Sequence, residues 1–365
     1  MSTAAACRRP AAHVLGAALV LALTATTVTT ASAAPHHAPR VQRVSTAADG
    51  TQADGPSDDS AISADRRHVT FVSTAPNLGC ADFHPCLLVK DLAGGGLTRI
   101  DLGPGYLYSS PMPSADGSRV GYSAGTRFLV PYLYDRATGR SERLWPQNPP
   151  GFNEMGRVQS ISPDGTHVAY TIGNRHGPQA FRLLYVRDTV SGTDELVSPA
   201  EEGAKPAASV SGDGRRVAYQ LQGSEQDPAD IFVKDLVTGE RVQADTGLGA
   251  AELVRITANG RRVLFNAGNG VYVHDLRTGV SRRVSEGHAY AATADGRYVL
   301  VAGADGLRVH DLRTGRLGAV LPTDAQVGPD ALAGGRPAVV FGSAESDLVP
   351  GDTNGVADIF VQHSP

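Results

Sequence analysis

The chain has 365 residues, a formal net charge of −4 at pH 7, and only three cysteines. A mildly acidic chain gives no reason to expect a nucleic acid or an anionic membrane surface as a partner, because both attract basic proteins. The scarcity of cysteine restricts any thiol chemistry to a few positions.

The first 33 residues resemble an export signal. Arg8 and Arg9 form a short basic region, residues 14–23 form an apolar run, and Ala31-Ser32-Ala33 fits the small-x-small pattern of signal peptidase sites. The apolar run is too short to cross about 30 Å of hydrocarbon, which makes a membrane anchor the weaker alternative. We therefore expect cleavage near Ala33, and a mature chain of residues 34–365 that is secreted or held in the cell envelope without membrane insertion.

Cys80 and Cys86 are the cysteines that remain after export, because Cys7 leaves with the signal. An oxidising compartment favours a disulfide that closes this short loop. Asp82 and His84 lie between the two thiols, so a zinc site is the alternative. The Cys-x₅-Cys spacing without a second cysteine pair is a weak zinc pattern, and we expect the disulfide.

A turn followed by a strand recurs seven times in the mature chain. Gly follows the turn position in five of the seven units, and such D-G or N-G pairs accept the positive φ of a tight hairpin. Val lies four residues after every turn position, and an aromatic residue lies six residues after it in all units but one, which has Val301. Apolar residues two apart describe a β-strand. The turn positions are Asp65, Asp116, Asp164, Asp213, Asn259, Asp295 and Gly335.

A second pattern, D-x-x-x-G after an alternating strand, recurs six times. Its aspartates are Asp91, Asp135, Asp188, Asp235, Asp275 and Asp311. Their average spacing is 44 residues, which is the length of a four-stranded propeller blade. We interpret the aspartates of both patterns as turn formers, because Asp side chains bind nearby backbone amides in turns.

The last unit reaches Asp358 to Val361, its third strand, and lacks a fourth. The segment Val41 to Ser45 resembles the internal fourth strand Ser281 to Ser285. The sequence therefore predicts an all-β, seven-bladed propeller of four-stranded antiparallel blades in one domain, residues 34–365. The N-terminal strand, residues 40–45, completes the last blade. The alternative, an open array of hairpins, leaves strand edges exposed.

The repeats resemble those of TolB-like propellers, also called WD-like propeller repeats. The similar stretches are Ser162-Pro163-Asp164-Gly165 through Tyr170, Ile231 through Gly239, and Asp347 through Val361. True WD repeats carry a Trp-Asp pair in each blade, whereas Trp145 is the single Trp here. The resemblance implies a propeller that binds proteins or small ligands outside the cell or in its envelope, and it implies no enzyme activity.

The innermost strands predict little chemistry. Ser or Thr lies two residues before most turn positions, and small residues dominate four residues before them, with Arg255 the charged exception. If either set lines the channel, the lining lacks the convergent His, Asp or Glu that acid–base catalysis or metal binding needs. We expect these hydroxyls to bond neighbouring blades. The sequence also lacks a G-x-S-x-G elbow, so we predict no catalytic residue and no organic cofactor.

Asp352, Asn354 and Asp358 supply oxygen ligands in a loop that contains Gly355. Calcium favours such ligands, but the spacing misses the EF-hand pattern. A calcium site and a plain turn before a strand both remain open.

Aromatic residues gather in the second unit, where Tyr106, Tyr108 and Trp145 are candidates for ligand binding. Arg255 is the fourth candidate, as the charged residue of the predicted channel. Ordinary packing is the alternative role for the aromatic residues.

Three hypotheses of function follow. The first is a monomeric, exported, non-catalytic propeller that binds a protein, peptide or glycan. The second is a propeller lyase or hydrolase acting on a carbohydrate or a lactone at the channel mouth. The third is a structural envelope protein. The fold alone does not decide among them.

Overall fold

The computed structural model describes residues 40–81, 84–103, 105–147, 155–173, 183–199, 202–204, 207–223 and 227–364. The predicted export signal and Asp82 lie outside these residues. The chain divides into two units, Met1–His37 and Ala38–Pro365, and the second contains every described residue. Within the described ranges, no helix has the length and apolar character needed to cross a membrane.

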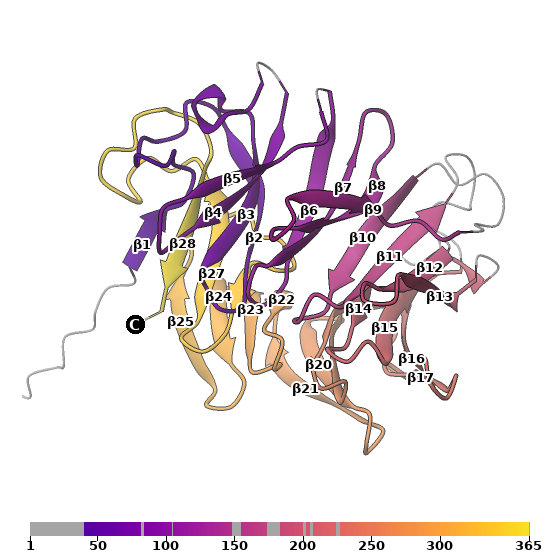
Figure 1. Cartoon of the computed structure of the whole chain (residues 1–365). Helices are drawn as coiled ribbons and strands as arrows, with labels where there is room; N and C mark the ends of the chain where they lie inside the picture. The colour runs from indigo at the N-terminus through magenta and orange to yellow at the C-terminus, as the bar shows by residue number, and fades with distance from the viewer. Residues whose placement is uncertain are drawn as a thin grey trace, which may run out of the picture. The chain divides into compact units, whose positions relative to one another are not determined.

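Seven sheets of four antiparallel strands make up the described fold, as predicted (Figure 1). Blade 1 consists of β2 (Ser57–Ile62), β3 (His68–Ser73), β4 (Cys86–Asp91) and β5 (Leu97–Ile100). Blade 2 consists of β6 (Leu107–Pro113), β7 (Arg119–Gly125), β8 (Val130–Asp135) and β9 (Arg140–Arg143). Blade 3 consists of β10 (Met155–Ile161), β11 (His167–Gly173), β12 (Leu183–Asp188) and β13 (Thr193–Ser198). Blade 4 consists of β14 (Ala208–Val210), β15 (Arg216–Leu221), β16 (Asp230–Asp235) and β17 (Arg241–Gln243). Blade 5 consists of β18 (Ala251–Ile256), β19 (Arg262–Ala267), β20 (Gly270–Asp275) and β21 (Val280–Glu286). Blade 6 consists of β22 (His288–Ala292), β23 (Tyr298–Gly303), β24 (Gly306–Asp311) and β25 (Arg316–Val320). Blade 7 consists of β26 (Leu332–Ala333), β27 (Ala338–Ser343), β28 (Asp358–His363) and β1 (Arg40–Arg43).

The last blade is shared between the two ends of the chain, as predicted. Its strand order is β26-β27-β28-β1, and β1 pairs antiparallel with β28 from Arg40↔His363 to Arg43↔Phe360. In Figure 1 the indigo β1 lies beside the yellow β28. The pairing continues beyond β1, because Val44 N donates to Ile359 O at 2.7 Å. The N-terminal strand therefore closes the ring.

The valines and rings of the first repeat form the core between blades. All seven valines at the fourth position after the turn are at most 2% exposed, and the six rings at the sixth position are fully buried. The rings face the outer strands of the preceding blade, as Tyr122 does against Leu87, Val89 and Ile100 of blade 1. The small residue between them also has a packing role, because a Cβ on Gly121 would lie 3.0 Å from Val158 of the next blade.

The Ser or Thr before each Asp turn binds its own hairpin rather than a neighbouring blade. In blade 3, Ser162 Oγ donates to Asp164 Oδ1 at 2.6 Å and accepts from His167 N at 2.9 Å. The same two bonds recur in blades 1, 2, 4, 5 and 6. For the Ser and Thr residues two positions before the turns, the expected bridging between blades is wrong, because the turn amides are nearer donors. For Ser160 and Ser209, four positions before their turns, it is confirmed, because their Oγ atoms accept from Val210 N and Ile256 N of the next blade.

The D-x-x-x-G aspartates also act as turn caps, as predicted. Asp235 Oδ1 accepts from Val237 N and Thr238 N, and the same pair of bonds forms at Asp91, Asp135, Asp188 and Asp275. Asp311 Oδ1 accepts from Arg313 N. Asp235 additionally accepts from Arg215 Nε at 2.8 Å and Arg216 Nε at 3.3 Å. The hydrogen bond from Arg215 lowers the pKa of Asp235 from 3.8 to about 2.

The alternation of strands gives the propeller two unlike faces. Both kinds of tight turn lie on one face, which we call the turn face. The longer connections between second and third strands, and those between blades, lie on the opposite face, which we call the loop face. The innermost strands β2, β6, β10, β14, β18, β22 and β26 all begin at the loop face and end at the turn face.

The closing strand gives a first testable prediction. A chain that begins at Thr46 loses β1 and the buried Val44, and it leaves the buried Asp358 without Ser45 and Arg43. We expect its free energy of unfolding to fall by about 3–5 kcal/mol, the usual cost of a buried charge left unpaired. Urea unfolding would be compared with a chain that begins at Ala38. Equal midpoints for the two chains would contradict the ring closure.

The Asp235 contacts give a second prediction. A carboxylate whose pKa is lowered in the folded state stabilises the protein above its ordinary pKa of 3.8, and this stability is lost as pH falls toward 2. Asp235→Asn should therefore destabilise the protein at pH 7, and the difference from the parent should shrink between pH 4 and pH 2. Unfolding by urea across this range measures it. Glu240→Gln, which removes an exposed carboxylate from the same hairpin, is the control. A pH-independent difference would refute the linkage.

Candidate functional site

Residues of all seven blades line a narrow cavity on the central axis near the turn face. Its volume is about 50 Å³, room for a few waters and too small for a sugar ring. Most of the lining comes from apolar residues three positions and one position before the turns: Ile62, Pro113, Ile161, Val210, Ile256 and Leu332, with Ala64, Ala115, Pro163, Ala258, Ala294 and Gly334. Ser209, Arg255 and Asp330 add polar groups. Ser209 and Arg255 belong to the set expected in the lining, whereas the described Ser and Thr residues two positions before the turns do not line this cavity.

Backbone hydrogen bonds between neighbouring blades surround this end of the channel. Asp65 N donates to Ala115 O at 2.8 Å, and Ala115 N donates to Pro163 O at 2.7 Å. On the other side of the ring, Gly212 N donates to Ala258 O at 2.8 Å and Ala258 N to Ala294 O at 2.7 Å. The turn face thus satisfies many of its polar groups internally, and this leaves fewer of them for a ligand.

Arg255 lies in the channel, as expected, but its charge has protein partners. Its guanidinium forms an ion pair with Asp330 of blade 7, and its Nη1 donates to Ala292 O of blade 6 at 2.6 Å. Arg255 and Asp330 side chains are 21% and 14% exposed. These contacts join three blades, so the side chain has a structural role in the described conformation.

The loop-face mouth holds strained backbone in blades 1 and 2. Asp59 and Ser110 lie in irregular stretches of β2 and β6, with φ of 49° and 55°. Positive φ is costly for residues with a Cβ and persists where the surroundings impose it. Asp59 Oδ2 accepts from Ser110 N at 2.7 Å, which links the two blades. The neighbouring Asp58 is exposed, so this part of the mouth presents carboxylates.

Blades 5 and 6 place a polar and aromatic group at the same mouth. Glu252 Oε2 lies 3.5 Å from His288 Nε2, and the His288 ring meets Tyr290 edge-on with 5.0 Å between centroids. Tyr290 is 45% exposed. Asn266 fixes the strand that carries both rings, because it exchanges two hydrogen bonds with the Ala289 backbone. The group therefore combines a carboxylate on β18 with an imidazole and an accessible ring on β22.

The aromatic candidates from the sequence are largely packing residues. Tyr108 is 8% exposed, and its hydroxyl accepts from Leu102 N at 3.1 Å. Tyr106 packs against the same core as Tyr108, and Trp145 packs against the core of blades 2 and 3. Arg143 stacks over the Trp145 ring at 4.2 Å. Ligand binding by these residues stays a prediction, and the structure does not bring them together with Arg255.

The predicted calcium ligands lie together at the closing strand. Arg43 Nη2 lies 3.3 Å from Asp352 and its Nε lies 3.6 Å from Asp358, so a guanidinium faces both carboxylates. Asp358 is fully buried, and burial raises its pKa.

The oxygen atoms that calcium would need have protein donors in this arrangement. Asp358 accepts from Ser45 Oγ and from Asn354 Nδ2, and Asn354 Oδ1 accepts from Val356 N. Asn354 Nδ2 also donates to Ala53 O at 2.9 Å. We call Arg43, Ser45, Asp352, Asn354 and Asp358 the clasp, because they tie β1 to the loop before β28. Hydrogen-bond donors of the protein already occupy the oxygen atoms that a calcium ion would use. The arrangement therefore fits a hydrogen-bonded clasp better than a calcium site.

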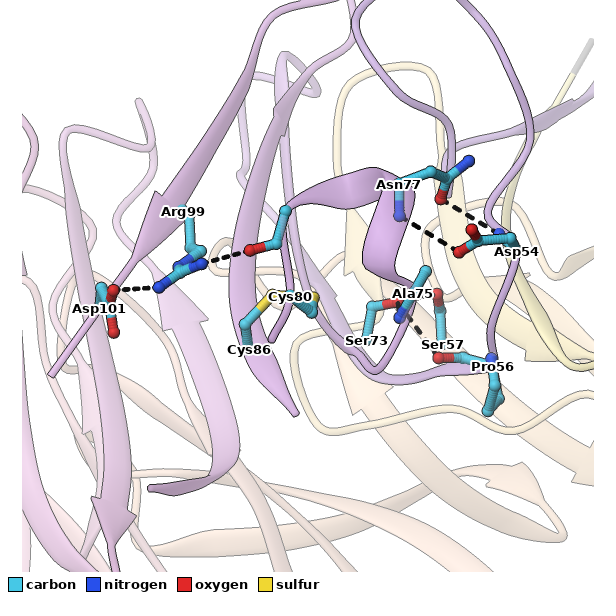
Figure 2. Close-up of a disulfide and its surroundings, with 11 residues drawn as sticks. Asp54, Pro56, Ser57, Ser73, Ala75, Asn77, Cys80, Cys86, Arg99 and Asp101 are labelled. Carbon is cyan, nitrogen blue, oxygen red and sulfur yellow. Dashed lines mark hydrogen bonds and ion pairs between the residues drawn. A yellow bond between two sulfur atoms is a disulfide. The ribbon is translucent and has the colours of Figure 1, made fainter. Parts of the chain in front are cut away.

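The predicted disulfide between Cys80 and Cys86 is confirmed. It closes the end of the loop between β3 and β4, beside the 3-10 helix Pro76–Leu78 (Figure 2). Both thiols are used in this bond, so the zinc alternative lacks its ligands. Asn77 of the same helix pairs with Asp54 through two hydrogen bonds, which fastens the segment after β1 to blade 1.

Sequence reasoning missed Asp59, the Glu252–His288–Tyr290 group and the partner of Arg255. The spacing that placed the innermost strands could have located His288 and Tyr290, which lie just before the Asp295 turn. Their proximity to Glu252 could not be predicted from the repeat pattern, because Glu252 lies in the neighbouring blade. Among the described residues, no group of three or more His, Cys, Asp or Glu side chains is arranged to hold a metal ion.

Similarity to a solved lyase structure supports the propeller fold. A solved structure of an oligogalacturonate lyase in complex with manganese matches with a TM-score of 0.58 and 13% identity, over 90% of this chain and 93% of the lyase. TolB from Acinetobacter baumannii matches with a TM-score of 0.44 and 13% identity, over 85% of this chain and 64% of that structure. No protein-family model and no curated protein matches the sequence.

The clasp gives a third prediction. Asp358→Ala should lower the free energy of unfolding by about 3–5 kcal/mol, because Arg43 then lies partly buried without this partner. A chelator in excess should leave the melting temperature of the parent unchanged, since Arg43 supplies the positive charge. Asp305→Ala, at an exposed ion pair, is the matched control and should have little effect. A melting temperature that rises by several degrees with added calcium would restore the calcium site.

Proposed function

We propose that the protein is an exported, non-catalytic module that binds a protein, peptide or glycan on the loop face of the propeller. The contrast between the two faces carries this proposal. The turn face repeats internally capped hairpins around a channel of about 50 Å³. The loop face presents Tyr290 and the carboxylates of Asp58 and Glu252, each from a different blade.

The composition of the loop face suits recognition. An exposed aromatic ring beside polar groups can bury apolar area and still form directional bonds, which is why Tyr is frequent in binding sites. Tyr290 is held by β22 and by the His288 ring, so little side-chain freedom would be lost on binding. The disulfide supports export to an oxidising compartment. The repeat motifs support a TolB-like relationship within this proposal.

A carbohydrate lyase is the second candidate. The Glu252–His288 contact at 3.5 Å favours it, because a carboxylate beside an imidazole can orient the ring as a general base. The lyase with a TM-score of 0.58 has the same fold, but at 13% identity it gives no site residues for this chain. If the protein is an enzyme of this kind, its turnover must depend on His288.

Affinity capture from culture supernatant and cell envelope, with residues 34–365 as bait, tests the binding proposal. We expect recovery of a defined protein or glycan, and a loss of about tenfold in affinity for Tyr290→Ala, the cost of one interface residue worth about 1.4 kcal/mol. Val237→Ala is the control, because Val237 is 75% exposed in a hairpin of the turn face. Equal losses for the two variants would contradict a loop-face site.

The same protein should be assayed against oligogalacturonate and other uronate polymers, with and without added manganese, by the absorbance of unsaturated products. No turnover is expected. Turnover that is abolished by His288→Ala, together with no captured partner, would replace the binding proposal by the lyase.

A further inference from the structure

Blade 6 departs from the packing pattern of the other blades. In blades 2, 3, 4, 5 and 7, directly paired residues of the second and third strands form a stacked ring pair with centroids 5.5–6.1 Å apart. Blade 1 retains one ring, in the pair Phe71–Leu88. In blade 6 the equivalent pair is Val301 and Arg308, so both rings are missing.

The missing rings coincide with a groove between blades 5 and 6. The ring pairs of other blades pack on the outer strands of the preceding blade, as Tyr170 and Tyr185 do against Leu144 of blade 2. Between blades 5 and 6 this place is a groove of about 640 Å³. That volume is in the range of small-ligand sites. Its lining includes Val301, Arg308, His310 and Leu317 of blade 6, with Ser285 and Glu286 of blade 5.

The Arg308 guanidinium lies in this groove with only a weak ion pair to hold it. Its Nε is buried and has no hydrogen-bond partner among the residues that the structure describes. Its Nη2 contacts Asp305 at 3.4 Å, but Asp305 is 77% exposed, so water and salt weaken that pair. The Arg308 side chain is nevertheless 27% exposed, so a ligand can reach the guanidinium on the side away from Nε.

Blade 4 shows how a guanidinium stacks on a ring at the equivalent position. Arg241 stacks over Phe232 of the ring pair of blade 4, with 4.7 Å from the guanidinium carbon to the ring centroid. Blade 6 supplies the guanidinium of Arg308 without a ring. Leu317 and Val320, which are 56% and 41% exposed on β25, add apolar surface on the same side of the blade.

The acidic residues at the rim limit the charge of a ligand. Glu286 and Asp305 are both largely exposed at the groove. His310 cannot balance them near neutral pH, because burial lowers its pKa and its Nδ1 is engaged with Ser285 Oγ at 2.9 Å. An uncharged ligand group therefore fits this groove better than a free carboxylate.

We propose that this groove binds an aromatic side chain of a peptide or protein ligand. The ring takes the place of the missing ring pair and stacks on the Arg308 guanidinium. The inference rests on the proposed binding function and names the chemistry of one contact within it.

The test uses N-acetyl-L-phenylalanine amide, with N-acetyl-L-leucine amide and phenylacetate as comparison probes, titrated into residues 34–365 and followed by amide chemical shifts. We expect shifts at Gly303, Gly306 and Arg308, and affinity for the phenylalanine probe about fivefold above that for either comparison probe. Equal affinity for the leucine probe or tighter binding of phenylacetate would overturn the proposal. The absence of any shift at about 10 mM probe would also overturn it, because even a weak binding site has a dissociation constant in the millimolar range.

Two variants locate the probe. Arg308→Met keeps the groove and should weaken binding about fivefold, whereas Arg313→Met, on the turn face of the same blade, should not. Val301→Phe restores a ring and should abolish binding. Unchanged binding in both Arg308→Met and Val301→Phe would overturn the site. Because the probes need no macromolecular partner, the capture experiment can fail while this one succeeds, and the reverse outcome is equally distinguishable.

Discussion

Seven interfaces between neighbouring blades hold this molecule together, and every other feature depends on their continuity around the ring. Each interface buries the valine of one repeat against the blade before it, and six of the seven also bury the ring of that repeat. Apolar burial of this kind is the main favourable contribution to folding. Blade 7 differs from the other blades in origin, because its fourth strand is present only when β1 joins β28.

This requirement explains the concentration of polar contacts at the clasp. Short sheets with few strands are marginal on their own, and blade 7 receives its fourth strand from the opposite end of the chain. Arg43, Ser45 and Asp358 fix the register of that strand in a buried setting. The residues that resembled calcium ligands in the sequence are thus the ones that specify the closure.

The sequence predicted the blades, their closure and the disulfide because each depends on local or repeated patterns. Val at one position in every unit and D-x-x-x-G at another set the register of strands and turns. The direction of the hydroxyls at Ser162 and its equivalents was mispredicted, because a single strand does not reveal whether the turn amide or the next blade is nearer. Contacts such as Arg255–Asp330 and Glu252–His288 join different blades, so only the assembled ring reveals them. In the sequence, Val301 is the residue without a ring at the sixth position after the turns. Only the strand pairing shows that its partner position, Arg308, also lacks a ring.

The clasp also has a consequence for the order of events during synthesis. Ser45 and Asp358 are 313 residues apart in the chain, so β1 leaves the ribosome early and its partner β28 leaves it last. Contacts of such long sequence separation slow folding, because the loop must close before they form. Blades 1 to 6 can pair their own strands as they emerge, while β1 keeps an open edge throughout. The last blade is therefore completed only after β28 has been made, and until then the segment that becomes β1 has no strand partner.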